Sequence, residues 1–288
     1  MQEKINDYKR FYNAPDALGC ESNIINAYLW NEEYKLYVAV WDDTLLKAYF
    51  RDDTRVWGYC LPAGKNIRGA LELMFADAAE RGQAPHIAYM TAAERDTLEA
   101  LFPGKFTYRR EEGNQDYIYL SRDLATLAGK KYHAKRNHIS KFYRTYGDDA
   151  HFSTLDRSNL ADAMRVMRDW CAENDYNPQD YGEVKVFQKA CDCFDALGLH
   201  GGVLYIEDKP VAMTMGCAIS PACFDVMFEK ALREYDGVYA VINNEFAKTL
   251  TQYPYINREE DMDMEGLRKA KLSYHPALVY DRFSAWPL

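Results

Sequence analysis

The sequence lacks several features that would place it in a known class at once. No apolar run approaches the roughly 20 residues that a helix needs to cross a bilayer. The first residues, Met1-Gln2-Glu3-Lys4, do not form a signal peptide pattern. The seven cysteines are an odd number, and their spacing matches no metal site. We therefore expect a protein of the reducing cytoplasm with no metal centre.

The chain as a whole also contains fewer basic than acidic residues. The formal net charge is -9, from 35 Lys and Arg against 44 Asp and Glu. This balance argues against a general nucleic-acid coat, although a local basic patch remains compatible with it. No Ser/His/Asp or Cys/His nucleophile set can be assembled from the polar segments.

What the sequence does contain is a repeated order of strands and helices. Hydrophobic residues make up 48% of the chain, enough for a substantial core. In each half, three strand-like runs lead to a glycine-containing turn and then an amphipathic helix, which starts near Ile67 in one half and near Val238 in the other. We predict an α/β (α+β) protein of two similar units, at residues 1–121 and 149–288. Strands at 106–110 and 117–120 are expected to close the first unit, and a strand at 277–283 the second.

A basic segment lies between the two predicted units. Residues 122–148 are predicted to form a connector helix with aromatic and apolar side chains on one face. The opposite side collects Lys130, Lys131, Lys135 and Arg136. Basic side chains interleaved with aromatic ones are typical of surfaces that bind the phosphates of RNA or of lipid head groups. The alternative is a connector helix with a solvated Lys/Arg face.

The densest charge in the chain lies at residues 257–271. Asn257 to Asp261 directly follow an apolar run, so we expect them at the end of a strand, where loops often carry chemistry. The alternative is a solvated helix, for which Glu265 and Lys269 supply an (i, i+4) pair. Arg258 is also open to a structural role, paired with Glu260 or Glu265.

The order of strands, turn and helix is that of the GNAT acyltransferase fold, in which a turn before a helix holds a pyrophosphate. The turn at 233–239 contains Gly237 but also Glu234 and Asp236, which would repel coenzyme A. The turn at Gly64-Lys65 is more favourable to an anion, but a single Gly-Lys pair is a weak signal.

Two longer stretches carry a family resemblance. They are residues 123–138, which include Gly129-Lys-Lys-Tyr-His-Ala-Lys-Arg136, and residues 256–276, which include Asn257-Arg-Glu-Glu-Asp261 and the run from Glu265 to Pro276. Together they resemble a bacterial family related to the C-terminal catalytic domain of phosphatidylglycerol lysyltransferases. That family is similar to tandem GNAT-fold proteins such as the Fem-type aminoacyltransferases. The resemblance covers roughly residues 20–285. The lysyltransferases also carry an N-terminal membrane domain that has no counterpart in this sequence.

The resemblance implies two tandem GNAT-like units, each a mixed, mainly antiparallel sheet flanked by helices. It also implies an acyl- or aminoacyl-transferase that uses aminoacyl-tRNA or acyl-CoA as co-substrate, with no tightly bound cofactor and with an amine or hydroxyl acceptor. A phospholipid head group is one such acceptor, which would bring peripheral contact with anionic lipid. The alternative is an inactive GNAT-fold protein that binds a small molecule or a peptide.

The resemblance also assigns roles to the charged residues. The catalytic set would comprise Arg258, Glu259, Glu260 and Asp261, with an acid as base or as clamp for an ammonium group. Substrate binding would fall to Asn257, Glu265, Arg268, Lys269, Lys271 and Tyr274. The carrier phosphates would be held by Lys130, Lys131, Lys135, Arg136 and Gly237.

Overall fold

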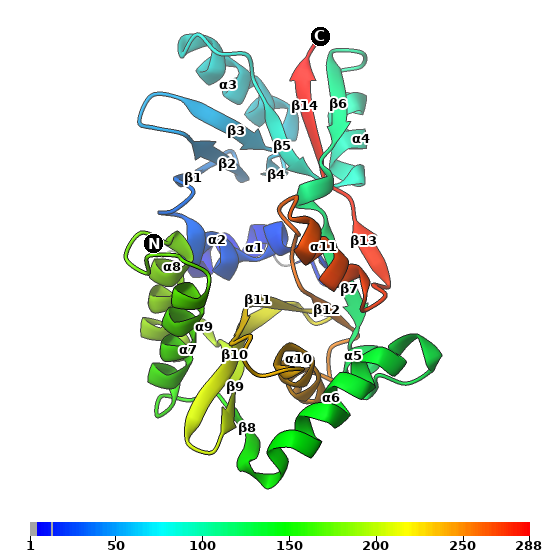
Figure 1. Ribbon diagram of the computed structural model, residues 1–288. Coiled ribbons are helices and arrows are strands. Elements are labelled where there is room, and N and C mark those ends of the chain that lie inside the picture. The colour runs from blue at the N-terminus through cyan, green and yellow to red at the C-terminus, as the bar shows by residue number, and fades with distance from the viewer. Residues whose placement is uncertain (1–4, 13) are drawn as a thin grey trace.

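The computed structural model describes residues 5–12 and 14–288, so the four N-terminal residues used above in the signal-peptide argument lie outside it. Figure 1 shows two β-sheets, one above the other, with the N-terminal helices α1 (Ile5–Tyr12) and α2 (Ile24–Trp30) between them. Each sheet has seven strands and mixes one parallel pairing with antiparallel ones. The predicted mixed α/β class with two similar units is confirmed.

The first sheet is covered on one face by helices α3 (Ile67–Glu80) and α4 (Ala92–Leu101). Asn66 and Thr91 begin these helices, because each side chain accepts a hydrogen bond from a backbone N–H of the first turn. The strands are, in spatial order, β1 (Leu36–Trp41), β2 (Thr44–Phe50), β3 (Val56–Cys60), β5 (Ile87–Met90), β14 (Phe283–Pro287) and β6 (Phe106–Arg110), with β4 (Ala63–Gly64) beside β2.

The second sheet is covered on both faces. Helices α7 (Leu160–Glu173), α8 (Gly182–Asp192) and α9 (Phe194–Leu197) pack on one face, while α6 (His133–Tyr146) and α10 (Val238–Thr249) pack on the other. The strands are, in spatial order, β13 (Leu278–Tyr280), β7 (Asp116–Leu120), β12 (Tyr255–Asn257), β11 (Cys223–Ala231), β10 (Lys209–Ser220), β9 (His200–Ile206) and β8 (Ala150–Thr154). The helices that follow the third strand of each unit begin at Ile67 and Val238, as predicted.

The two sheets exchange strands, which the sequence analysis did not foresee. The strand expected to close the first unit, β7, pairs with β12 and β13 in the second sheet. The single strand expected at 277–283 is two strands: β13 stays in the second sheet, and β14 returns to the first between β5 and β6. The boundary at residue 121 therefore does not separate the two sheets. Local pattern predicts a strand but not its partner, because a partner distant in sequence leaves no local trace.

The connector is helical, as predicted, but it is broken. Helix α5 (Ser121–Thr126) ends at Leu127, whose φ of 48° is left-handed, and α6 begins after a short 3-10 turn (Lys130–Tyr132). Tyr132 and Phe142 are buried, which confirms the predicted apolar face. Of the described residues, no helix combines the length and apolar character needed to cross a bilayer.

A buried ion pair joins the two sheets. Arg282, just before β14, donates to Asp116 at the start of β7 at 2.8 Å, and both side chains are at most 2% exposed. Asp116 also accepts from the backbone N–H and thiol of Cys20 and from the side chain of Asn257. Gly19 leaves room for the guanidinium, since a Cβ there would lie 2.3 Å from Nη2 of Arg282. The N-terminal segment, the C-terminal strand and the second sheet thus meet at one carboxylate.

We expect Arg282→Ala to lower the free energy of unfolding by about 3–5 kcal/mol, because it leaves the carboxylate of Asp116 buried without its counter-charge. Chemical denaturation of the two proteins measures the difference. The matched control is Arg110→Ala, which removes a surface pair with Asp281 and should cost about 1 kcal/mol or less. Equal decreases in the free energy of unfolding for the two variants would show that the buried pair stabilises the protein no more than the surface pair does.

Candidate functional site

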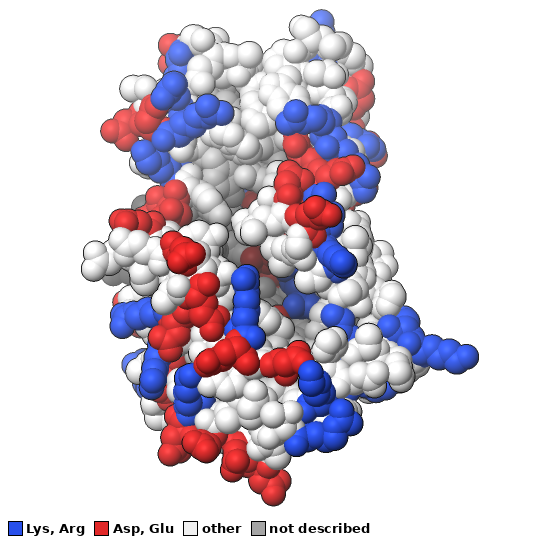
Figure 2. Space-filling model, in the orientation of Figure 1, with Lys and Arg blue, Asp and Glu red and all other residues white. Residues whose placement is uncertain are grey.

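A large cavity of about 1070 Å³ lies between the two sheets. Figure 2 shows the molecule hollowed at this place, with acidic and basic side chains inside the hollow. Its walls come from α2, α8, β11, the loop after β12 and α11 (Glu265–Leu272). Its volume lies at the upper end of the range of about 300–1,000 Å³ that is typical of small-molecule sites.

The structure brings only part of the predicted set together. Seven of the predicted residues line the cavity: Lys135, Gly237, Arg258, Glu259, Glu260, Lys271 and Tyr274. The remaining predicted residues are not part of its wall: Lys130, Lys131, Arg136, Asn257, Asp261, Glu265, Arg268 and Lys269. The loop from Arg258 to Glu260 follows β12 directly, as the sequence analysis predicted.

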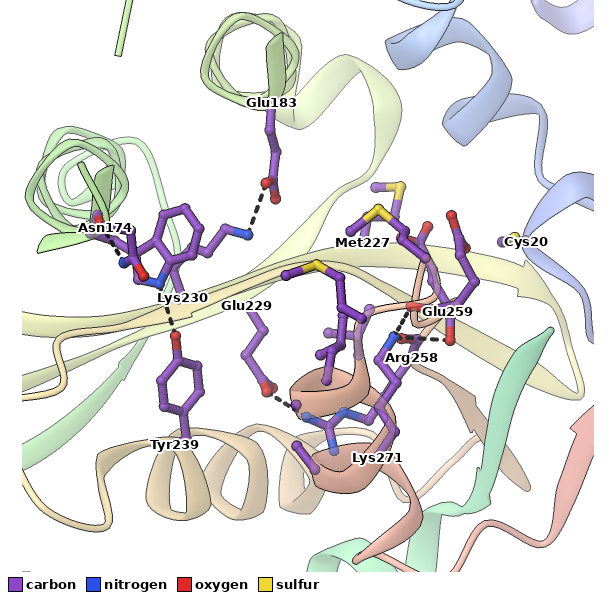
Figure 3. A pocket seen from close by; sticks show the side chains of 18 of the residues that line it. Cys20, Asn174, Glu183, Met227, Glu229, Lys230, Tyr239, Arg258, Glu259 and Lys271 are labelled. Atoms are coloured by element: carbon purple, nitrogen blue, oxygen red, sulfur yellow. Dashed lines mark hydrogen bonds and ion pairs between the residues drawn. The ribbon is translucent and has the colours of Figure 1, made fainter. Parts of the chain in front are cut away.

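Arg258 is held by a partner from a different strand. Its guanidinium donates to the carboxylate of Glu229 on β11 at 2.7 Å, and both side chains are nearly buried. Figure 3 shows the two side chains directed toward each other. The guanidinium also lies over the ring of Tyr274, 4.9 Å from its centre. The structure thus records neither of the suggested pairings with Glu260 and Glu265; Nη1 of Arg258 has no hydrogen-bond partner among the described residues.

Lys271 fixes the loop that contains the acids. Its ammonium donates to the backbone carbonyls of Arg258, Glu259 and Glu260, and the side chain is buried. Three donors for three acceptors satisfy the ammonium completely. Lys271 is therefore a positioning residue for the loop, although burial lowers its pKa.

Glu259 and Glu260 are the acids of the cavity wall. Glu259 accepts from the side chain of Asn26 at 2.6 Å, and its backbone has a left-handed φ of 56°. Burial, and then the nearby carboxylate of Asp225, raise the pKa of Glu259 well above its usual range. Burial also raises the pKa of Glu260. A carboxyl group whose pKa is raised toward neutrality suits proton transfer at physiological pH.

Asp225 is a buried carboxyl group that sequence reasoning did not find. It lies on β11 behind Glu259, accepts from Asn23 at 3.1 Å, and its Oδ1 has no partner among the described residues. Burial raises the pKa of Asp225 to about 8. Its only sequence signal is an acid inside the apolar run Cys223–Phe228, which is unusual for a central strand.

The remaining predicted acid has a structural partner. Asp261 is completely buried and accepts two hydrogen bonds from Arg268 and one from the hydroxyl of Tyr117. Although burial raises the pKa of Asp261, the bonds from Arg268 and Tyr117 outweigh this and lower it. Asn257 is also buried, and donates to Asp116 and to the carbonyl of Leu18. These residues hold the loop in place from outside the cavity.

The cavity wall opposite Arg258 is aromatic. The rings of Trp170, Tyr176 and Tyr181 stack with centres 4.8–5.9 Å apart. The ammonium of Lys230 lies 4.3 Å from the centre of Trp170 and pairs with Glu183 at 2.8 Å. Figure 3 shows Lys230 directed toward Glu183. The adjacent charges of Glu229 and Lys230 at the end of an apolar strand were a signal that sequence reasoning missed.

Lys135 faces the cavity from α6. Its ammonium lies 3.8 Å from the centre of the Tyr274 ring, and no ion pair joins it to an acid among the described residues. Burial, and then the charge of Arg258, lower the pKa of Lys135 to about 8. The ammonium is therefore the cation of this wall most in need of an anionic partner.

The other basic residues of the connector face elsewhere. Arg136 donates to the carbonyls of Leu127 and Gly129 and so caps the end of α5. Lys131 pairs with Asp123 at 3.1 Å, and Lys130 is exposed. Lys269 and Glu265 are exposed on α11, with no ion pair between them in the described structure.

The N-terminus of α10, where the GNAT fold holds pyrophosphate, is part of the cavity wall, which includes Gly237, Val238, Tyr239 and Ala240. On another side the turn packs against α6, since a Cβ at Gly237 would lie 2.7 Å from the backbone carbonyl of His138. The acids of the turn are paired: Asp236 with Lys141, and Glu234 with Lys209 at 2.7 Å. The predicted repulsion is thus largely neutralised within the protein.

One cluster has the composition of a metal site. The ligand atoms of Cys20, Asp116 and Glu260 lie within 4.8 Å of one another. However, both oxygens of Asp116 already accept hydrogen bonds, one of them from the guanidinium of Arg282. A fixed positive charge beside the carboxylate disfavours a cation, so these residues do not fit a metal.

Comparison with known proteins places the chain among aminoacyl-transferring relatives. The model of the family described as "Phosphatidylglycerol lysyltransferase, C-terminal" matches residues 15–286. A conserved protein of unknown function from Bacteroides thetaiotaomicron is similar in structure, with 34% identity, a TM-score of 0.91, and coverage of 100% of this chain and 98% of the other. The family match over residues 15–286 confirms the predicted family resemblance.

Two more distant structures share the fold. The first is L-PGS from Bacillus licheniformis, with 14% identity, a TM-score of 0.69, and coverage of 99% of this chain and 91% of the other. The second is FemX, with 11% identity, a TM-score of 0.62, and coverage of 97% and 95%. The predicted tandem GNAT-like architecture is confirmed.

The lowered pKa of Lys135 predicts a reactive amine. At pH 8 about half of the Lys135 side chains should be neutral, against about 0.4% for a lysine of ordinary pKa, so an amine-directed reagent should label it first. Replacing Arg258 with Met should raise the pKa of Lys135, because one nearby positive charge is removed. Site-resolved mass spectrometry over a pH series measures both. Labelling of Lys135 at the rate of the exposed lysines would contradict the assignment.

Proposed function

Because this chain belongs to the phosphatidylglycerol lysyltransferase C-terminal family, we propose that it transfers an aminoacyl group from an aminoacyl-tRNA to an amine or hydroxyl acceptor. The observation that carries the proposal is the pair formed by Glu259 and Arg258 at the cavity wall. Glu259 supplies a carboxyl group with a raised pKa, and Arg258 supplies a guanidinium with a free N–H group.

The reaction needs little covalent help from the protein. The aminoacyl ester of the carrier is already activated, so the site must orient the acceptor, take up its proton and stabilise the developing oxyanion. The acceptor oxygen or nitrogen attacks the ester carbon while its proton passes to Glu259. The bond to the ribose oxygen then breaks, and that oxygen takes the proton from Glu259. No cofactor enters this sequence of steps.

Arg258 is suited to the oxyanion. The carboxylate of Glu229 accepts a hydrogen bond from Nη2 of Arg258, and the ring of Tyr274 lies against the guanidinium. The position of the guanidinium is therefore set before substrate binds. The free Nη1 is a donor in a largely buried setting, where a hydrogen bond to a developing charge is worth more than in water. Glu260, which shares the wall, suits the amino group of the transferred residue.

The turn at Gly237 favours a tRNA carrier over coenzyme A, because it carries the acids Glu234 and Asp236. A pyrophosphate bound there would have to compete with these carboxylates for Lys209 and Lys141. Lys135, with no acidic partner, remains to contact a carrier phosphate at the cavity, and Lys130 extends the basic surface outside it. We assign Gly237 a packing role instead of the phosphate-binding role that the sequence suggested.

The structure constrains the identity of the acceptor less than that of the carrier. A phospholipid head group fits the family description, and it would require contact with the surface of an anionic membrane. The second candidate function is binding without transfer. It is favoured by the ion pairs that already neutralise the cavity cations Arg258 and Lys230, since a paired site can hold a ligand without doing chemistry.

We expect the purified protein to accelerate deacylation of aminoacyl-tRNA only when an acceptor is present, and to be inactive with acetyl-CoA. Glu259→Gln keeps the shape of the side chain but removes the base, so the rate should fall by roughly 10²–10⁴. Glu265→Gln, on an exposed residue outside the cavity, is the matched control. Radiolabelled aminoacyl-tRNA with phosphatidylglycerol vesicles or amines measures the transfer. Binding of the tRNA without any transfer would favour the second candidate.

The pH dependence should report the coupling of Glu259 to Asp225. Because the base must be unprotonated, the rate should rise with pH through the pKa of Glu259. Asp225→Asn removes a negative charge that raises this pKa, so the rise should move to lower pH. A pH–rate profile measures the shift, with Asp53→Asn on the surface as control. An unmoved profile would mean that another group supplies the base.

A further inference from the structure

One feature of the first sheet has no part in the mechanism above. Five aromatic rings form a continuous strip on the sheet face opposite α3 and α4. The rings belong to Tyr49, Tyr89, Trp57, His86 and Trp286, and we call them the aromatic strip. Along β14, Phe283 and Ala285 pack toward the helices, so Trp286, the residue after Ala285, points to the other face by alternation.

The rings contact one another in sequence across four strands. Tyr49 lies 5.4 Å from Tyr89, and Tyr89 lies 5.3 Å from Trp57, measured between ring centres. Trp57 meets His86 edge-on at 4.9 Å, and His86 stacks on Trp286 at 4.7 Å with only 6° between the planes. Gly58 makes this possible, since a Cβ there would lie 3.0 Å from the ring of His86.

The aromatic strip is not part of a hydrophobic core. None of its five residues belongs to the buried clusters formed by the described residues. All five side chains are half-buried, so their edges or faces meet solvent. A contiguous apolar surface that is left exposed usually marks a binding site.

The position of the aromatic strip ties it to the cavity. Tyr49, at one end, is itself part of the cavity wall. At the other end the guanidinium of Arg109 lies 4.9 Å from the centre of Trp286. A ligand that reaches from the cavity along the first sheet would therefore meet aromatic rings first and then a cation.

Basic side chains accompany the rings. Arg51 and Arg109 both act on the charge of His86, which places them near this ring together with Glu111. Arg109 pairs with Glu111, whereas Arg51 is exposed and has no ion pair among the described residues. Over the first sheet, Figure 2 shows uncharged surface between two groups of Lys and Arg side chains.

We propose that the aromatic strip binds the unpaired nucleotides at the aminoacylated end of the carrier RNA, with bases against the rings and phosphates toward Arg51 and Arg109. This deepens the proposed function and rests on it. The base of the terminal nucleoside and the aminoacyl ester share one ribose, so the base must lie beside the cavity that holds the ester. Unpaired bases stack on aromatic side chains irrespective of sequence, and arginines beside the rings hold the backbone.

The test uses the intact protein and a short fluorescein-labelled single-stranded RNA that carries no amino acid. We expect it to bind, and the same RNA without bases on its terminal nucleotides to bind roughly tenfold more weakly or worse, because stacking is lost. Trp286→Ala should weaken the first RNA by a similar factor and leave the base-free RNA unchanged. The matched control is Trp41→Ala, a 41% exposed tryptophan on β1 away from the aromatic strip.

The outcomes separate this inference from the proposed function. Equal binding of the two RNAs to the wild-type protein would overturn it, whether or not Trp286→Ala folds. It would also be overturned if Trp286→Ala lost binding to phosphatidylglycerol vesicles but kept its affinity for RNA, since the aromatic strip would then face a membrane. Selective RNA binding without any aminoacyl transfer would support the inference and count against the proposed function.

Discussion

The carboxylate of Asp116 is the point on which the architecture depends. It is completely buried, so it must be compensated, and its partners come from three distant parts of the chain: Cys20, Asn257 and Arg282. A buried charge of this kind contributes less to net stability than to the choice of a single arrangement. Asn257 is the residue before the loop of Arg258, Glu259 and Glu260. The same carboxylate therefore joins the two sheets and anchors the segment that carries the proposed chemistry.

The site loop illustrates how a strained, charged segment is held in place. Three successive carbonyls point at one ammonium, that of Lys271, while the neighbouring Asp261 is fixed by Arg268 and Tyr117. Lys271 supports the loop from the cavity wall itself, whereas Asp261 and Arg268 support it from outside, and Glu259 and Arg258 remain part of the wall. Rigid support of a few reactive groups is what a reaction based on positioning and electrostatics requires.

Only part of this arrangement could be predicted from the sequence. The order of strands and helices along the chain, the helices that begin at Ile67 and Val238, and a polar loop after Tyr255–Asn257 follow from local periodicity and composition. The structural roles of Asp261 and Arg136 could not be predicted from the sequence. The partner Tyr117 of Asp261 is distant in sequence, and Arg136 bonds to a backbone carbonyl, that of Leu127. We did not predict roles for Glu229, Lys230 and Asp225, because they lie on a central strand whose hydrophobic pattern is typical of a buried core. Charges within an apolar strand were a usable signal, because Glu229 and Lys230 both line the cavity, whereas of the charged residues in α11 only Lys271 does.

The return of the last strand to the first sheet has a consequence for how the chain is made. Strand β14 lies between β5 and β6, so the first sheet is interrupted until residues 283–287 have been made. Until then β5 and β6 present unpaired edges, although both strands leave the ribosome more than 170 residues earlier. Such edges are prone to pair with the wrong partner. The first sheet can therefore be completed only after the strands of the second sheet have been made, and deletion of β14 would separate β6 from the first sheet and leave the pairings of the second unchanged.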